Sequence, residues 1–362
     1  MMPRPHTKVR TRFFRPAEGE VVEDFGRPPA FADDALALRF SRLHAGDLRY
    51  TAAWGRWSVW NSTRWKCDET CRVMDLARHV CREASAECEE KIAPRIASAV
   101  TIAAVERLAR ADRCHAATVD QWDADPWLLN TPAGVVDLRT GALRPAARED
   151  YCTKITAVAP NGGQCPLWQE FLARITHGNA EFQGFMQRMC GYTLTGITRE
   201  QALFFLYGTG ANGKTVFLNT ISGVMGDYAR TAPIEAFIAS RNEHHPTDLA
   251  GLQGARLVTA AETEDGRRWA ESKLKALTGG DRIAARFMRQ DFFEFVPQFK
   301  LIVVGNHKPG LGTVDEAVRR RFNLLPFTLT IPAAERDAEL AEKLSKEWSG
   351  ILQWMVDGCL SW

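Results

Sequence analysis

Residues 203–215 read LFFLYGTGANGKT, an apolar run that leads directly into a glycine-rich loop. Residues 208–215 fit the pattern G-x-x-x-x-G-K-[ST], which binds phosphate where it follows a strand and opens a helix. The apolar pattern predicts that strand over residues 203–207 and the helix over residues 214–225. The stretch therefore predicts a strand, a phosphate-binding loop and a helix in succession.

Each residue type in this loop suits a nucleotide. The residues expected to bind ATP are Gly208, Thr209, Gly210, Ala211, Asn212, Gly213, Lys214 and Thr215. Glycines let backbone N–H groups wrap a polyphosphate, and the helix N-terminus adds partial positive charge. We expect Lys214 to reach the β- and γ-phosphates and the Thr215 hydroxyl to ligate Mg²⁺. A glycine turn with a chance Lys-Thr is the alternative, which the flanking strand and helix disfavour.

An acidic motif follows the next predicted strand, in residues 256–264 (RLVTAAETE). An NTPase needs a carboxylate at the end of a neighbouring strand, to hold Mg²⁺ and to polarise the attacking water. Glu262 and Glu264 are the candidates, with Glu262 also a candidate metal ligand. The pattern leaves open which glutamate has which task, and a solvated acidic turn is the alternative.

Two further motifs carry candidate catalytic residues. Asn306 ends the apolar run 300–305, where its amide could bond both the γ-phosphate and the attacking water, although asparagine is also a common turn residue. Arginines 319–321 precede the predicted strand 322–327. In a ring of identical subunits, Arg320 or Arg321 could reach the neighbour's γ-phosphate. A solvated basic turn is the alternative.

Residues 273–295 predict a basic, aromatic hairpin. Its arginines alternate with aromatic residues, as Arg282, Arg286 and Arg289 with Phe287, Phe292 and Phe293. Such a hairpin could grip single-stranded DNA through phosphates and stacking, so the three arginines are the candidate DNA-binding residues. Alternatively, the aromatic residues belong to the core and the arginines to the surface.

The order of these segments predicts the fold class. Strands at 203–207, 256–261, 299–304 and 322–327 alternate with helices at 214–225 and 272–277, which indicates an α/β domain with a mainly parallel sheet. Upstream, residues 33–111 show a helical pattern interrupted by an aromatic hairpin at 50–65. A small β-rich connector follows at 127–158 and a helical stretch at 167–194.

With these motifs in this order, the chain resembles superfamily 3 helicases, and in particular the phage and plasmid primase–helicase family with its poxvirus-type members. The segments that carry the resemblance are FLYGTGANGKT, HPTDLAGLQGARLVTAAETE, LKALTGGDRIAARF, FKLIVVGNHKP and DEAVRRRFNLLPF, preceded by WGRWSVWNSTRW, DADPWLLNTPAGVVDLRTG and CPLWQEFL. The resemblance implies a P-loop NTPase (AAA+-like) motor that uses ATP and Mg²⁺. It also implies a hexameric ring that translocates on single-stranded DNA, 3′ to 5′, in phage or plasmid replication.

The resemblance also suggests a domain layout. We expect a flexible tail at 1–32, a helical N-terminal domain at 33–165, the motor at 166–332 and a C-terminal helical segment at 333–362 that begins a truncated region. Longer family members carry a primase domain upstream that the segment before Asp33 cannot house, so we expect no primer synthesis by this chain. A separate primase or replication initiator is then a further expected partner. The alternatives are a non-unwinding ATP- and DNA-binding module and a different P-loop enzyme such as a small-molecule kinase.

Composition and charge limit the classes of protein to which this chain can belong. The formal net charge is only +2, so any DNA contact must come from local clusters of Lys and Arg. No apolar stretch is long enough to span a bilayer and the start lacks the apolar centre of a signal peptide, which predicts a cytoplasmic protein with no membrane partner. The nine cysteines of so long a chain are expected to be reduced thiols.

Three residue clusters have less specific patterns. The spacings of Cys67, Cys71, Cys81 and Cys88 do not fit zinc knuckles, and a helix would place the first two one turn apart. The pair His244-His245 is expected to lie in a polar loop. The tryptophans at 54, 57, 60 and 65 could stack on bases, but hydrophobic core is the favoured interpretation.

Overall fold

The computed structural model describes residues 28–238, 247–261, 269–287, 291–306 and 316–362. The chain divides into two compact units. The helical unit comprises the segment that ends at His44 together with Thr70–His115, and the sheet unit comprises Ala45–Glu69 and Ala116–Trp362. Among the described residues, no helix is long and apolar enough to cross a membrane.

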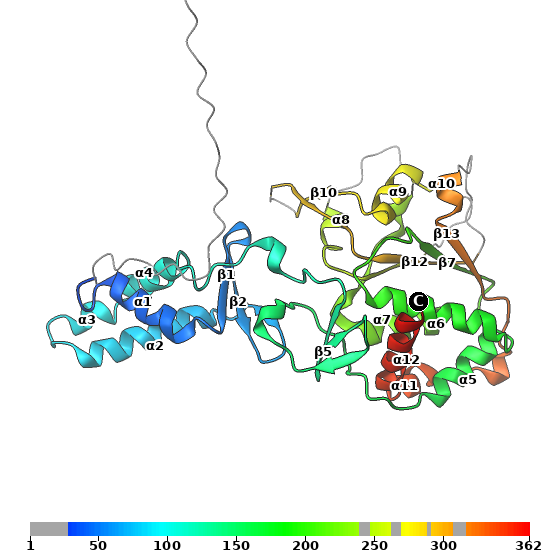
Figure 1. Ribbon diagram of the computed structural model, residues 1–362, viewed down its shortest axis with the longest axis horizontal. Coiled ribbons are helices and arrows are strands. Elements are labelled where there is room, and N and C mark those ends of the chain that lie inside the picture. Colours follow the sequence, from blue (N-terminus) through cyan, green and yellow to red (C-terminus); the bar gives the residue numbers. More distant parts are fainter. Residues whose placement is uncertain (1–27, 239–246, 262–268, 288–290, 307–315) are drawn as a thin grey trace, which may run out of the picture. The chain divides into compact units, whose positions relative to one another are not determined.

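The helical unit contains α1 (Asp33–His44), α2 (Arg72–Glu87), α3 (Ala93–Ile96) and α4 (Ala99–Ala109) (Figure 1). Buried residues recur at helical spacing on α2, at Val73, Ala77, Val80, Cys81 and Ala84, and α1 packs against both α2 and α4. The Ser98 hydroxyl begins α4 by accepting a hydrogen bond from the N–H of Thr101 at 3.2 Å. The predicted helical pattern is confirmed here.

Two small antiparallel sheets open the sheet unit. The first has the order β1 (Leu48–Thr51), β2 (Arg56–Trp60) and β3 (Trp65–Cys67), and the second has β4 (Leu128–Thr131), β5 (Gly134–Asp137) and β6 (Ala142–Arg144). They confirm the predicted aromatic hairpin and the predicted β-rich connector. Arg256 joins the second sheet to the rest of the unit, because its buried guanidinium donates to the carbonyl oxygens of Leu128, at 2.8 Å, and Leu194, at 2.6 Å.

The main sheet has five parallel strands in the order β13-β7-β12-β9-β8. Their bounds are β7 (Leu203–Tyr207), β8 (Ala229–Thr231), β9 (Leu257–Ala261), β12 (Lys300–Gly305) and β13 (Phe322–Pro326). This confirms the predicted α/β class with a mainly parallel sheet. Because all pairs run parallel, the carboxyl ends of all five strands lie at one edge.

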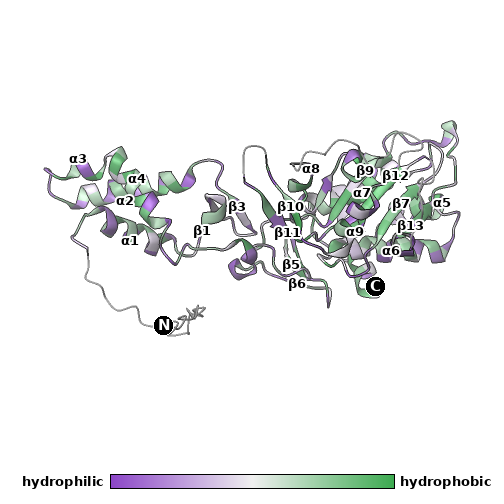
Figure 2. Ribbon diagram, turned by 90° about the horizontal axis from the view of Figure 1, so that it is seen from above, coloured by the Kyte–Doolittle hydropathy of each residue, from purple (hydrophilic) through white to green (hydrophobic). Residues whose placement is uncertain are grey.

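Helices and one hairpin complete the unit. They are α5 (Pro166–Ile175), α6 (Ala180–Leu194), α7 (Lys214–Met225), α8 (Thr247–Ala250), α9 (Glu271–Gly279), α10 (Glu316–Arg319), α11 (Leu340–Ser345) and α12 (Trp348–Ser361), with β10 (Ile283–Ala285) and β11 (Phe293–Phe295). Strands β7, β9 and β12 of the main sheet are predominantly hydrophobic (Figure 2). Alternate residues of β7 face two separate cores: Phe204 and Leu206 pack with α5, α6, α7 and α12, and Leu203 and Phe205 pack on the other face.

The C-terminal helix α12 is part of the first core and packs along α6. Their backbones approach closely at Gly191 and Gly358: a Cβ on Gly191 would lie 2.1 Å from the backbone nitrogen of Cys359. The Glu347 carboxylate before α12 accepts hydrogen bonds from the N–H groups of Leu167, at 3.1 Å, and Trp168, at 2.9 Å, at the start of α5. Residues 347–361 therefore connect α5 and α6, through the Glu347 hydrogen bonds and the packing of α12.

Some local expectations were wrong. The predicted helical stretch 167–194 is two helices, because His177 (φ 52) and Gly178 (φ 72) adopt left-handed backbone conformations that end α5. Strand β8 lies at the sheet edge and has three residues, too few for a period-2 pattern. Cys67 ends a strand and Cys71 precedes α2, so these two cysteines do not share a helix turn.

Candidate nucleotide-binding site

The glycine-rich loop joins β7 to α7, as predicted, and two of its positions accept glycine alone. A Cβ on Gly208 would lie 2.0 Å from the carbonyl oxygen of Phe327. Gly213 has φ 86, and a Cβ there would lie 2.8 Å from the Ile175 side chain. The loop is therefore pressed against α5 on one side and against the segment after β13 on the other.

Asn212 fixes the loop from inside. Its side chain is 3% exposed, and its Nδ2 donates hydrogen bonds to the carbonyl oxygens of Thr209 and Phe327, the latter at 2.8 Å. The N–H of Ile331 donates to the carbonyl oxygen of Ala211 at 2.8 Å. The loop is thus preorganised by the chain that follows β13, a role that the sequence pattern did not assign to Asn212.

Lys214 is the first residue of α7 and is 5% exposed. Its ammonium donates to the carbonyl oxygen of Gly208 at 2.5 Å and to Oδ1 of Asn212 at 3.0 Å. Burial lowers the pKa of Lys214, since these neutral acceptors replace water only in part. Thr209, Gly210, Ala211 and Thr215 are less enclosed, and Thr215 is exposed beside the lysine. The Thr215 hydroxyl is the kind of hard oxygen donor that suits Mg²⁺.

Strand register places Asn306 at the same edge as the loop. Gly305 of β12 is paired with Tyr207 of β7, so Asn306 and Gly208 follow their strands at the same level. Asn306 is exposed. Strand β9 ends at Ala261, one strand further along, while the candidates Glu262 and Glu264 lie outside the described residues.

The candidate arginine fingers are at the opposite edge of the sheet. Leu203 donates its N–H to the carbonyl oxygen of Arg321 at 2.7 Å, which places Arg321 beside the amino end of β7. A strand of this length spans about 16 Å, so one chain does not bring this arginine to its own loop. Arg321 is 8% exposed, whereas Arg320 is exposed and its guanidinium donates to Oε1 of Gln201 at 3.3 Å.

The basic, aromatic hairpin forms from β10 and β11. Arg282 precedes β10 and is exposed, and the guanidinium of Arg286 lies 4.8 Å from the ring centre of Phe292. Phe292 is 60% exposed, and Phe287 stacks on Phe293 with ring centres 5.6 Å apart. Arg289 lies outside the described residues. The hairpin thus presents cations and aromatic faces together on its surface.

A cavity of about 380 Å³ adjoins the loop, and the sequence did not reveal it. Ala211 and Gly213 of the loop, Val216 of α7 and Phe171 of α5 contribute its apolar side, and Arg174 and Arg336 are among its polar residues. Its volume is that of a small-molecule site. The apolar lining beside the glycine-rich loop is of a kind that suits the base or ribose of a nucleotide.

The less specific clusters resolve as follows. Among the residues that the structure describes, no group of three or more His, Cys, Asp or Glu could hold a metal ion. His244 and His245 lie outside the described residues. Trp57 and Trp65 are buried, which confirms a core role, but Trp54 is 38% exposed and is an exception to that interpretation.

Comparison with known proteins adds the family. Residues 37–177 match the family described as D5 N terminal like, and residues 206–321 match a family of unknown function, DUF5906. The chain has the architecture of a superfamily 3 helicase-like protein. The second match begins on β7 and contains the whole loop.

Two viral proteins that are named as helicases are similar in sequence to part of this chain. A candidate helicase of Acanthamoeba polyphaga mimivirus is 25% identical over 232 residues, which is 62% of this chain and 24% of the relative. A candidate helicase of Frog virus 3 (isolate Goorha) is 30% identical over 153 residues, 40% of this chain and 16% of the relative. The chain thus spans a quarter or less of the length of these relatives.

A solved structure of the C-terminal region of NrS-1 has a similar fold, with a TM-score of 0.56 at 10% identity, covering 90% of this chain and 69% of that one. A second structure of that region gives a TM-score of 0.54 at 9% identity, covering 88% and 68%. At such identity the matches show a shared fold alone.

Proposed function

We propose that this chain is the ATP- and Mg²⁺-dependent motor of a DNA helicase, with a P-loop NTPase fold of the AAA+-like kind in residues 166–332. One observation carries the proposal: the loop 208–215 is preorganised between β7 and α7, with the buried ammonium of Lys214 held on its carbonyl oxygens. An ATP polyphosphate would give that ammonium anionic acceptors in place of neutral ones.

In the proposed site, Thr215 ligates Mg²⁺ and the pair Glu262 and Glu264 supplies the second metal contact and the group that polarises water. Asn306 senses the γ-phosphate, because its strand ends level with the loop. The nucleoside occupies the adjoining cavity of about 380 Å³. Together these residues form one face of an ATP site.

The position of the arginines supports a homo-oligomer. The amino end of β13 lies across the sheet from the loop, so a finger from this segment has to come from a neighbouring subunit. We assign the finger to Arg320, since it is exposed while Arg321 is buried. The proposed assembly is a hexameric ring with ATP bound between subunits.

The proposed substrate is single-stranded DNA, gripped by Arg282, Arg286 and Arg289 on the hairpin and moved 3′ to 5′ during phage or plasmid replication. The pairing of Arg286 with the exposed Phe292 supports this, because phosphate contact and base stacking need a cation and an aromatic face side by side. A separate primase or replication initiator would act with it. Residues 33–165 are the proposed N-terminal region, and residues 333–362 are the proposed C-terminal segment, whose helix α12 packs into the core of the motor.

Steady-state ATP hydrolysis, measured with and without single-stranded DNA and beside a Lys214→Ala variant, tests the proposal. We expect hydrolysis that DNA stimulates and that the variant abolishes, followed by strand displacement on a tailed duplex. ATP binding without turnover under all of these conditions would contradict the motor and favour a non-unwinding binding module.

A further inference from the structure

A second basic surface lies in the sheet unit. It is a cavity of about 430 Å³ between β2, β3, the segment at 153–154 and the residues after α7. Its charged lining residues are Arg56, Arg64, Lys66, Lys154, Arg230 and Asp227. We call it the β3 groove. Five cations against one carboxylate give it a strong positive charge although the chain as a whole is nearly neutral.

The single carboxylate is already engaged. Asp227 forms an ion pair with Arg64, whose Nη1 also donates to the carbonyl oxygen of Thr153 at 3.3 Å. Arg56, Lys66 and Arg230 are exposed, and no carboxylate in the described part of the chain pairs with them. The groove therefore retains excess positive charge that an anionic ligand would neutralise.

Lys154 shows how crowded these cations are. Burial lowers its pKa most, the positive charges of Arg230 and Arg64 lower it further, and Asp123 and Asp227 oppose them. Both arginines are thus near enough to act on the ammonium of Lys154 electrostatically. A phosphate placed among the three would reverse this effect and favour the charged lysine.

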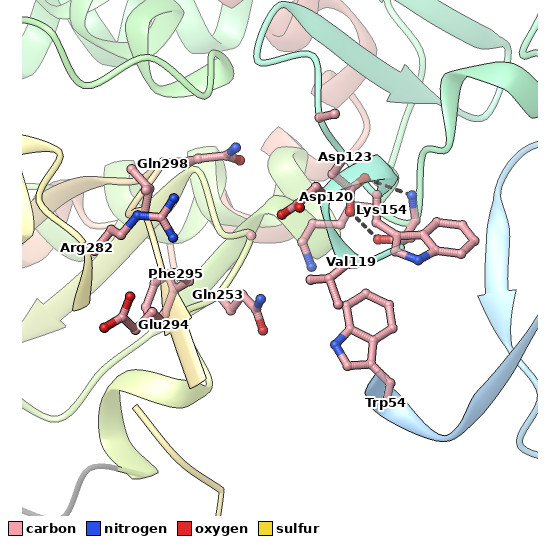
Figure 3. A pocket seen from close by; sticks show the side chains of 15 residues that line it. Trp54, Val119, Asp120, Asp123, Lys154, Gln253, Arg282, Glu294, Phe295 and Gln298 are labelled. Atoms are coloured by element: carbon pink, nitrogen blue, oxygen red, sulfur yellow. Dashed lines mark hydrogen bonds between the residues drawn. The ribbon is translucent and has the colours of Figure 1, made fainter. Parts of the chain in front are cut away.

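An aromatic face stands at the rim of the groove. Trp54 is 38% exposed and rests on Trp122, with ring centres 6.2 Å apart and planes at 25°. Trp54, Thr153 and Lys154 also line an adjoining cavity of about 410 Å³, whose other side carries Arg282 of the hairpin (Figure 3). The supported indole is therefore placed where a strand leaving the groove toward Arg282 would present a base.

We propose that the β3 groove binds the sugar–phosphate backbone of single-stranded nucleic acid, with one base stacked on Trp54. An exposed indole face stacks on an unpaired base, and the phosphates of a single strand are neutralised by clustered cations such as those of the groove. This site is additional to the hairpin arginines and operates without ATP hydrolysis. The groove and the hairpin together would hold one continuous strand.

Binding of a short fluorescent oligo-dT to the whole chain, in the absence of nucleotide, tests the proposal by anisotropy over a salt series. The Arg56→Ala/Arg230→Ala double variant removes two exposed cations that form no ion pair with a carboxylate of the described residues. We expect weaker binding and a slope of log K against log salt that is shallower by about 1.4, as the loss of two phosphate contacts requires. The matched control is Arg188→Ala/Lys346→Ala, which removes two exposed cations of α6 and of the α11–α12 junction.

The tryptophan is tested with two ligands. Trp54→Ala should weaken oligo-dT binding by about 5-fold or more and leave an abasic oligonucleotide unaffected, while Trp54→Phe keeps most of the affinity. Unchanged affinity and salt slope in the arginine double variant would overturn the groove. Equal affinity of Trp54→Ala and the parent for oligo-dT would overturn the stacking. Neither readout depends on ATP turnover, so a failure of the helicase proposal leaves this test intact.

Discussion

Lys214 and Asp227 stand at the two ends of the same helix: Lys214 begins α7 and Asp227 follows its last residue, Met225, by two positions. The helix has twelve residues and is about 18 Å long. At its far end the N–H of Asp227 donates to the carbonyl oxygen of Ile155 at 3.0 Å, and the N–H of Ala157 donates to that of Val224 at 3.1 Å. The phosphate loop and the wall of the β3 groove are thus joined by one rigid element.

This connection predicts the effect of Asp227→Asn. The change removes the ion pair with Arg64, whose partly exposed side chains make it worth no more than about 1 kcal/mol, so the fold should persist. Basal ATP hydrolysis should stay within about 2-fold of the parent, since the loop is untouched. Stimulation by single-stranded DNA should reach its half-maximum at a lower DNA concentration, because the groove loses its one lining carboxylate and Arg64 is released to bind phosphate. DNA-dependent hydrolysis over a range of DNA concentrations measures it. Asp357→Asn on α12 is the control, and equal half-maximal DNA concentrations in parent and Asp227→Asn would contradict the coupling.

The pKa of Lys214 predicts how ATP affinity depends on pH. Burial lowers this pKa below its ordinary value of 10.5 in the nucleotide-free loop, and a bound polyphosphate would raise it again. At pH values between the lowered pKa of the free loop and the raised pKa of the complex, ATP binding is therefore accompanied by uptake of a proton by Lys214. Affinity is therefore full below that window and declines as pH rises through it.

Titrations of ATP from pH 8 upward provide the measurement. Lys214→Arg is the control because its guanidinium keeps its charge throughout that range, so its affinity should show no decline from this source. A parent protein whose affinity is as independent of pH as that of the arginine variant would show that Lys214 does not titrate on binding.

Two glycines on α6 offer a matched test of packing. A Cβ on Gly191 would lie 2.1 Å from the backbone nitrogen of Cys359, so Gly191→Ala must separate α6 from α12 and should destabilise by about 1–3 kcal/mol or more. A Cβ on Gly184, on the same helix, would meet only the flexible end of Arg188 at 3.4 Å. Gly184→Ala should therefore be neutral or stabilise by up to about 1 kcal/mol. Urea unfolding measures both, and similar effects would contradict the close helix crossing.

The sequence predicted most of the main sheet and its glycine-rich loop, because these segments have patterns that can be recognised from neighbouring residues alone. The strand at 203–207 and the helix from Lys214 can be predicted from the local apolar pattern and the glycine positions alone, and both predictions were confirmed. Asn212 was different, since its partner Phe327 lies 115 positions away and only the folded chain brings them together. The β3 groove could not be predicted from the sequence for the same reason, because Arg56, Lys154 and Arg230 come from three distant segments. Trp54 carries no sequence signal that separates it from the buried tryptophans nearby.

The arginine at the far edge of the sheet predicts complementation between subunits. Arg320→Ala should lower turnover by about 10³-fold or more if it removes the finger, and Lys214→Ala should abolish it by disabling the loop. A mixed ring contains interfaces that combine an intact loop from one chain with an intact Arg320 from its neighbour, so mixing the two inactive variants should restore part of the hydrolysis. Arg319→Ala, which also removes an exposed arginine from this segment, is the control and should retain activity. ATP hydrolysis across a range of mixing ratios measures the effect, and mixtures no more active than either variant alone would show that Arg320 acts within its own chain or not at all.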